Sequence, residues 1–154
     1  MRRLKGLFLL TLIALVTFSA WGQDAEPTRE RAALLVKNGN YKEALAIYRK
    51  LCLDPKTEPE KVGNDLNKAA YCISRLGRLS ELDGLREETI RIHADNWRLL
   101  FAAAENYNSH SHHGFRVAGE FHRGPKRGGG ERINAWERDR VRALQLMRRA
   151  EKLA

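Results

Sequence analysis

Apolar residues recur at helical spacing along most of this chain, so the sequence predicts a series of short amphipathic helices. The first two helices are separated by Asn38-Gly39-Asn40, a stretch typical of a helix end because Gly and Asn tolerate a left-handed backbone. The second helix is expected from Tyr41 to Leu53 and ends at Asp54-Pro55, since proline disfavours helix in the residue before it. These two helices form a predicted antiparallel hairpin.

The same arrangement recurs twice further along the chain. Leu76-Gly77-Arg78 repeats the turn 38 residues after Gly39, and a helix is expected to continue from Leu79 to His93. A third unit begins at Asn96, whose side chain can cap a helix that opens with Trp97. Pairs of helices at a period of about 34 to 40 residues are typical of stacked helical repeats. We therefore expect an all-α fold of antiparallel helical hairpins over residues 23–107.

Residues 108–132 interrupt this pattern. They are rich in glycine and hold four of the five histidines, so we expect a Gly/His-rich loop that is functional, disordered or docked on another molecule. Residues 133–154 then predict a basic amphipathic helix, with apolar residues spaced among arginines from Trp136 onward.

The first 22 residues have the three parts of a secretory signal peptide. Arg2, Arg3 and Lys5 precede an apolar run from Leu7 to Phe18, and Ala20-Trp21-Gly22 offers small residues at a cleavage point. The alternative is a retained membrane anchor, but the run is shorter than the roughly 20 residues needed to span a bilayer. We expect cleavage after Gly22, a periplasmic or extracellular location, and no stable membrane span in the processed chain.

Charge narrows the class of partner. The net charge of +9 falls to +6 once residues 1–22 are removed, and the excess is concentrated between Arg116 and Arg149. A basic surface can contact nucleic acid, anionic lipid or an acidic protein, or can simply be solvated. Export makes nucleic acid the weakest of these alternatives, so a protein partner of unknown identity is expected and nucleic-acid binding is not.

The motifs that would indicate catalysis are missing. Arg127-Gly128-Gly129-Gly130 lacks the Lys-Ser/Thr pair and the preceding strand of a phosphate-binding loop. Neither cysteine belongs to a recognisable nucleophile motif, and we expect both Cys52 and Cys72 to be buried free thiols. The interpretation is a non-enzymatic protein without a cofactor.

Histidines supply the one alternative with metal chemistry. Imidazole is a common metal ligand, but a zinc site needs about four ligands in fixed geometry, which a flexible loop does not offer. A polar surface loop is favoured over a periplasmic metal-binding protein. The metal-ligand candidates are His110, His112, His113 and His122.

The stretch from Asn38 to Lys50, followed by Leu53-Asp54-Pro55, resembles the second half of a tetratricopeptide repeat. The resemblance implies a tight turn at Gly39, a close helix approach at Ala44, and an aromatic side chain between hairpins at Tyr48. Matching structural positions are Tyr41, Pro55, Gly77 and Trp97, and we expect Trp97 and Phe101 to lie in the core.

Other segments resemble the amino-terminal region of large exported bacterial alpha-2-macroglobulin-like proteins. The segments are Asp95 to Leu100, Gly114-Phe115, Val117 to Phe121, Arg127 to Gly130, and Glu137 to Gln145. The resemblance implies a leader module that precedes macroglobulin domains, as a docking element or as part of an endopeptidase-inhibitor assembly. No thioester motif follows either cysteine, so no protease-trapping residue carries over. Candidate partner-binding residues are Phe115, Phe121, Arg127 and Trp136.

Overall fold

The computed structural model describes residues 28–125 and 128–154. The expected signal peptide (residues 1–22) and Arg127 therefore lie outside the described residues. The elements, in chain order, are α1 (Arg29–Lys37), α2 (Tyr41–Leu53), α3 (Pro59–Arg75), the 3-10 turn η1 (Leu79–Glu81), α4 (Leu82–Ile92), α5 (Trp97–Ser109), β1 (His113–Val117), β2 (Glu120–Arg123), β3 (Glu131–Asn134) and α6 (Trp136–Leu153). The fold is mostly helical, as the sequence predicts, but it also contains a small antiparallel sheet.

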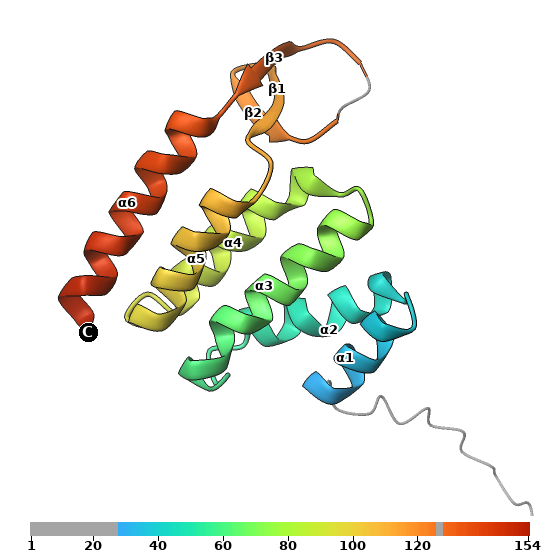
Figure 1. Ribbon diagram of the computed structural model, residues 1–154, viewed down its shortest axis with the longest axis vertical. Coiled ribbons are helices and arrows are strands. Elements are labelled where there is room, and N and C mark those ends of the chain that lie inside the picture. Colours follow the sequence, from blue (N-terminus) through green and yellow to red (C-terminus); the bar gives the residue numbers. More distant parts are fainter. Residues whose placement is uncertain (1–27, 126–127) are drawn as a thin grey trace, which may run out of the picture.

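α1 packs on α2, α2 on α3, α3 mainly on α5, and α5 on α6, while α4 makes smaller contacts with α2, α3 and α5. Helices α1 and α6 lie at opposite ends of the molecule (Figure 1). Turns between paired helices are made by Gly39 (φ +78°) and Gly77 (φ +67°), in the left-handed region where glycine avoids the cost of a Cβ atom. Ala44 and Tyr48 of α2 are buried, while Tyr41 is half-buried and Pro55 is exposed.

Small residues set the spacing between α3 and α5. A Cβ atom added to Gly63 would lie 2.8 Å from Cβ of Ala102, so glycine is needed for the two helices to approach this closely. The side chain of Asn96 accepts a hydrogen bond from the Leu99 amide at 3.2 Å and caps α5 as expected. The core is continuous across the helices, and its largest fully buried apolar side chains are Leu66, Ile73, Leu82, Leu99, Leu100 and Leu146.

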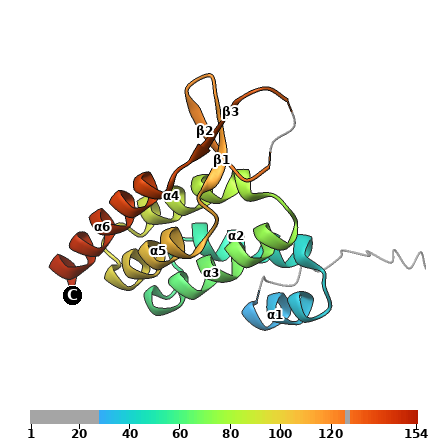
Figure 2. The same cartoon turned by 45° about the horizontal axis from the view of Figure 1, so that its top comes forward.

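The expectation of a loop over residues 108–132 is wrong, because much of this segment folds into the sheet. The strand order is β2-β1-β3, with both neighbours antiparallel to β1. Ala118 (φ +50°) and Gly119 (φ +85°) make the two-residue turn between β1 and β2, a conformation that suits the twist of a hairpin. Figure 2 shows the sheet standing at one end of the helices.

The last helix also begins later than expected. Ile133 belongs to β3, where it pairs with Gly114 of β1, and α6 starts at Trp136. Phe101 is a further correction, since its side chain is 47% exposed on α5 and does not belong to the core, whereas Trp97 is partly buried. Both cysteines are buried, and neither forms a disulfide. None of the helices in the described ranges combines the length and hydrophobicity required to cross a bilayer.

Candidate functional site

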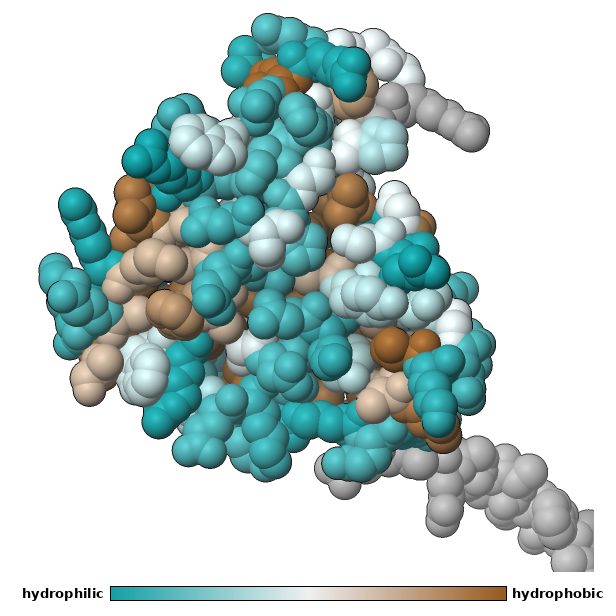
Figure 3. Space-filling view, viewed as in Figure 1, coloured by the Kyte–Doolittle hydropathy of each residue, from teal (hydrophilic) through white to brown (hydrophobic). Residues whose placement is uncertain are grey.

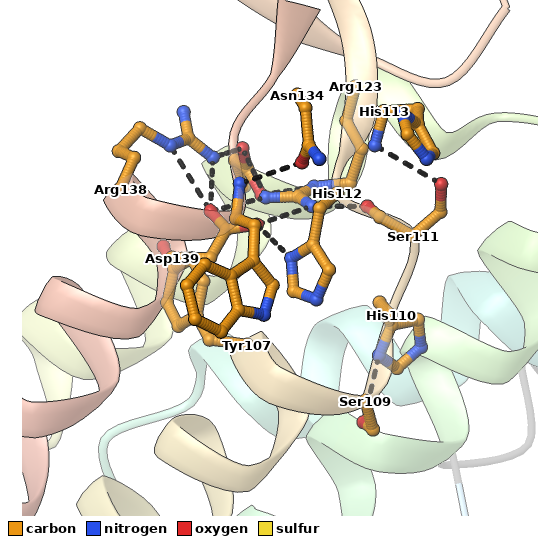
Figure 4. A network of polar contacts seen from close by, with 12 residues as sticks. Tyr107, Ser109, His110, Ser111, His112, His113, Arg123, Asn134, Arg138 and Asp139 are labelled. Carbon is orange, nitrogen blue, oxygen red and sulfur yellow. Dashed lines mark hydrogen bonds and ion pairs between the residues drawn. The ribbon is translucent and has the colours of Figure 1, made fainter.

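A buried ion pair fixes the sheet to the last helix. Arg123 at the end of β2 donates two hydrogen bonds to the carboxylate of Asp139 on α6, from Nη1 at 2.8 Å and from Nη2 at 2.9 Å. Figure 4 shows the contact between these two side chains. Both are fully buried. A two-point bond of this kind has a fixed geometry, so it sets the angle at which α6 leaves the sheet.

Three further side chains complete this contact. His112 bonds the Asp139 carboxylate through Nδ1 at 2.8 Å, and Arg138 bonds it at 2.8 Å. Asp83 of α4 accepts hydrogen bonds from Arg123 at 2.9 Å and from Arg138 at 2.6 Å. Burial alone would raise the pKa of Asp139, but the hydrogen bonds from Arg123, His112 and Arg138 outweigh it and lower the pKa from 3.8 to about 2. Both carboxylates are therefore ionised at neutral pH.

A second cluster joins α4, α5 and α6. The buried guanidinium of Arg86 donates to Asn106 Oδ1 at 2.7 Å and lies over the ring of Tyr107, 4.4 Å from its centroid. The Tyr107 hydroxyl donates to Glu87 at 2.7 Å, and Arg142 of α6 donates to the same carboxylate at 2.8 Å. Burial of Arg86 and the nearby Arg123 charge lower the pKa of Arg86 to about 10, which still leaves it charged.

The polar contacts of these two clusters are mutually satisfied. Among the described residues, no buried side-chain nitrogen or oxygen lacks a hydrogen-bond partner. Hydrogen bonds from arginine lower the pKa values of Asp83, Glu87 and Asp139 against the effect of burial. The clusters position α6 and the sheet against α4 and α5.

The four histidines that were candidate metal ligands each contact a different partner. His112 bonds Asp139, His110 bonds the carbonyl of Asn106 at 2.9 Å, and His122 lies in β2 opposite Phe115. His113 pairs across the sheet with Asn134. Within residues 28–125 and 128–154, no three His, Cys, Asp or Glu side chains gather closely enough to hold a metal ion.

An apolar groove runs along the border of α5 and α6. Two adjoining hollows share Leu144 and Met147: one continues to Trp136, Arg140 and Asn108, the other to Trp97, Phe101, Arg148, Ala150 and Glu151. Phe101, Trp136 and Leu144 are each 46–48% exposed. Figure 3 shows apolar residues gathered along this edge of the molecule, over α6 and its border with α5. We call these lining residues the α5–α6 groove.

Basic side chains frame the α5–α6 groove. Arg140 lies over the Trp136 ring, 5.3 Å from its centroid, and Arg98 lies over the Trp97 ring at 4.3 Å. Arg148 also lines the groove. In the described part of the chain these three guanidiniums form no ion pair, whereas Arg138 and Arg142 on the same helix pair with Asp83 and Glu87. Arg140 and Arg148 are thus unpaired charges among the described residues that line the groove.

The residues expected to bind a partner lie in different parts of the structure. Trp136 lies in the groove, but Phe115 and Phe121 are half-buried in the sheet, and the Phe121 ring supports the guanidinium of Arg138 at 4.3 Å. Phe101, which was expected in the core, instead lines the groove. The apolar spacing of the last helix did not indicate that Leu144 and Met147 lie on its groove face. One feature of the sequence could have revealed the groove. The apolar stripe on the last helix is wider than is needed to pack against a single neighbouring helix.

Comparison with known proteins finds no matching family model, no similar curated protein and no similar solved structure. The resemblances to tetratricopeptide repeats and to macroglobulin-like leader regions therefore rest on the residues quoted for them.

Proposed function

We propose that the processed chain is a non-catalytic docking module, which acts outside the cytoplasm and binds a protein partner through the α5–α6 groove. The observation that carries this proposal is the groove itself. Exposed apolar patches of this kind, rimmed by polar residues, mark interaction sites on soluble proteins. Aromatic and methionine side chains with arginine at the edge are also the composition enriched in protein interfaces.

We further propose that the helical pairs are tetratricopeptide-like. The glycine turns at residues 39 and 77, the buried Ala44 and the buried Tyr48 support this assignment. A stack of hairpins buries each hairpin against its neighbours and leaves a face at either end. The α5–α6 groove is such an end face.

The module is also proposed to be the leader part of a larger alpha-2-macroglobulin-like protein, and through it part of an endopeptidase-inhibitor assembly. The segments that carry the resemblance lie mainly in α5, the sheet and α6. These elements also build the groove and hold it in place. In that setting the groove would contact another part of the assembly.

The test is a pull-down from a cell-envelope extract with residues 23–154 as bait. Leu144→Glu places a charge in the groove, and Leu34→Glu is the matched control, because Leu34 is 57% exposed on α1 at the other end of the molecule. A specific partner that is retained by the control and lost with Leu144→Glu supports the proposal. Equal capture by both variants would place the interface elsewhere.

Export is tested separately by expressing residues 1–154 and determining the amino terminus of the product. We expect the processed chain to begin at Gln23 and to be recovered outside the cytoplasm. An unprocessed cytoplasmic product would remove the export proposal without affecting the groove.

A further inference from the structure

The occupant of the α5–α6 groove can be specified from its shape. The groove lies between two helices that run antiparallel, with Asn108 and Trp136 at one end and Trp97 and Ala150 at the other. Earlier in the chain the equivalent position is filled by a helix, since α5 packs on both α3 and α4. At α5–α6 no helix among the described residues fills it. A helix is therefore the element that fits.

The apolar lining sets the pattern that such a helix needs. From Trp136 to Glu151 the groove follows α6 for about 22 Å at 1.5 Å per residue, the length of roughly four helical turns. Its apolar lining includes Trp97, Phe101, Trp136, Leu144 and Met147. An amphipathic helix with apolar residues at positions i, i+4, i+7 and i+11 would cover this lining with one face.

The charged residues beside the groove indicate which charge should flank the apolar face of the bound helix. Arg140 and Arg148 line the groove, and Arg98 lies over the ring of the groove residue Trp97. Glu151 is the one acid among the groove-lining residues of the two hollows. A second copy of this chain would bring the same arginines against themselves, which disfavours self-association through this face. Acidic flanks on the occupant would instead meet three guanidiniums.

From these observations we infer that the α5–α6 groove binds an amphipathic helix of a partner protein whose apolar face is flanked by Asp or Glu. This inference rests on the proposed function of the groove as a docking surface. It adds the secondary structure and the charge of the partner.

The chain supplies its own probe for a direct test. Of the three tryptophans, Trp21 lies in the expected signal peptide, and the other two, Trp97 and Trp136, both line the groove. Intrinsic tryptophan fluorescence of residues 23–154 therefore reports on occupation of the groove, and the buried core lies wholly within these residues.

The experiment titrates this processed chain with three 15-residue synthetic peptides that carry Leu at i, i+4, i+7 and i+11. Their flanking positions hold Glu, Gln or Lys, and a fourth peptide is the Glu form with a central proline. We expect the Glu peptide to bind at least tenfold more tightly than the Lys peptide at low salt. The difference should shrink at high salt, because exposed charges are screened.

Two variants assign the effect to the groove. Leu144→Glu should weaken binding of the Glu peptide at least tenfold, while Leu34→Glu should leave it unchanged. The double variant Arg140→Gln/Arg148→Gln should bring the Glu and Lys peptides within about threefold of each other. Circular dichroism of each variant verifies that the helices are retained.

Several outcomes would overturn the inference. Equal affinity for the Glu and Lys peptides would contradict the charge preference. Equal affinity for the Glu peptide and its proline form would show that the bound segment need not be helical. Dimerisation of residues 23–154 abolished by Leu144→Glu would make a second copy the occupant, and Leu144-dependent binding to anionic vesicles would make it a membrane. If no peptide binds but capture of a partner still depends on Leu144, the docking function stands and the acidic helix is wrong.

Discussion

Arg123 and Asp139 form a fully buried, two-point ion pair that joins the second strand of the sheet to the last helix. The pair lies between residues 16 positions apart in the sequence, and Asp83 of α4 bonds the same guanidinium. The arrangement ties three elements together at one point. This contact helps to hold α6 in place, together with its packing along α5 and the bond from Arg142 to Glu87.

Replacing Asp139 with Asn should destabilise the fold strongly. The change leaves the buried Arg123 guanidinium with one carboxylate partner in place of two, and breaking a buried pair typically costs about 3–5 kcal/mol. Urea unfolding measures the loss. Glu105→Gln is the control, since Glu105 is exposed on α5 and should change the free energy of unfolding by less than about 0.5 kcal/mol. Similar losses for the two variants would contradict the role of the pair.

Stability should fall in acid because of the same carboxylate. The pKa of Asp139 is lowered to about 2 in the folded chain and is 3.8 in the unfolded chain, so the unfolded state takes up the proton first. Its stabilising contribution, roughly 2 kcal/mol, is complete above about pH 4 and is lost as the pH falls through 2. Asp83, whose pKa is also lowered against the effect of burial by bonds from Arg123 and Arg138, acts in the same direction.

The measurement is the free energy of unfolding between pH 5 and pH 2 for the wild type and for Asp139→Asn. The wild type should lose stability more steeply than the variant over this range. Parallel curves would show that Asp139 does not carry the effect.

Two glycine-to-alanine changes should have opposite signs. In β1, a Cβ atom on Gly114 would lie 2.2 Å from the carbonyl oxygen of His122, so Gly114→Ala should cost about 1–3 kcal/mol by forcing the strands apart. Gly84 in α4 has open space around it, and Gly84→Ala should stabilise the fold by about 0.5–1 kcal/mol. Thermal unfolding of both variants tests the close approach of β1 and β2, which a higher melting temperature for Gly114→Ala would disprove.

Leu144 and Leu146 provide a matched pair on one helix. Leu146 is 1% exposed and Leu144 is 48% exposed. Leu146→Ala should lose about 2–5 kcal/mol of stability through the lost burial and the resulting cavity, whereas Leu144→Ala should lose less than about 1 kcal/mol. Denaturant unfolding compares them. A large loss for Leu144→Ala would mean that this side chain is part of the core and that the groove is not an open surface.

The two cysteines should be unreactive in the native state. Cys52 and Cys72 are buried, and burial raises the pKa of Cys52 to about 12 and also raises that of Cys72. A thiol-specific reagent at pH 8 should label neither residue until urea unfolds the chain, because the thiolate is the reactive form. Rapid labelling without denaturant would contradict their burial.

Local sequence signals determined most of the helical part of this protein. The turns at Gly39 and Gly77, the cap at Asn96 and the break at Pro55 depend on residues within one or two turns of the chain, so composition and spacing are sufficient to predict them. The roles expected of Ala44 and Tyr48 came instead from the resemblance to a tetratricopeptide repeat, and both side chains are buried.

The sheet and the groove depended on the tertiary structure. Strands of four or five residues are stabilised by partners distant in the sequence, as Gly114 is by Ile133, and a glycine-rich stretch gives no local sign of that pairing. Periodicity placed Phe101 and Leu144 on helices, but their exposure depends on which neighbour covers each face. The pairing of Arg123 with Asp139 likewise required the folded chain, because an ion pair is specified by distance in space, and sequence spacing carries no such information.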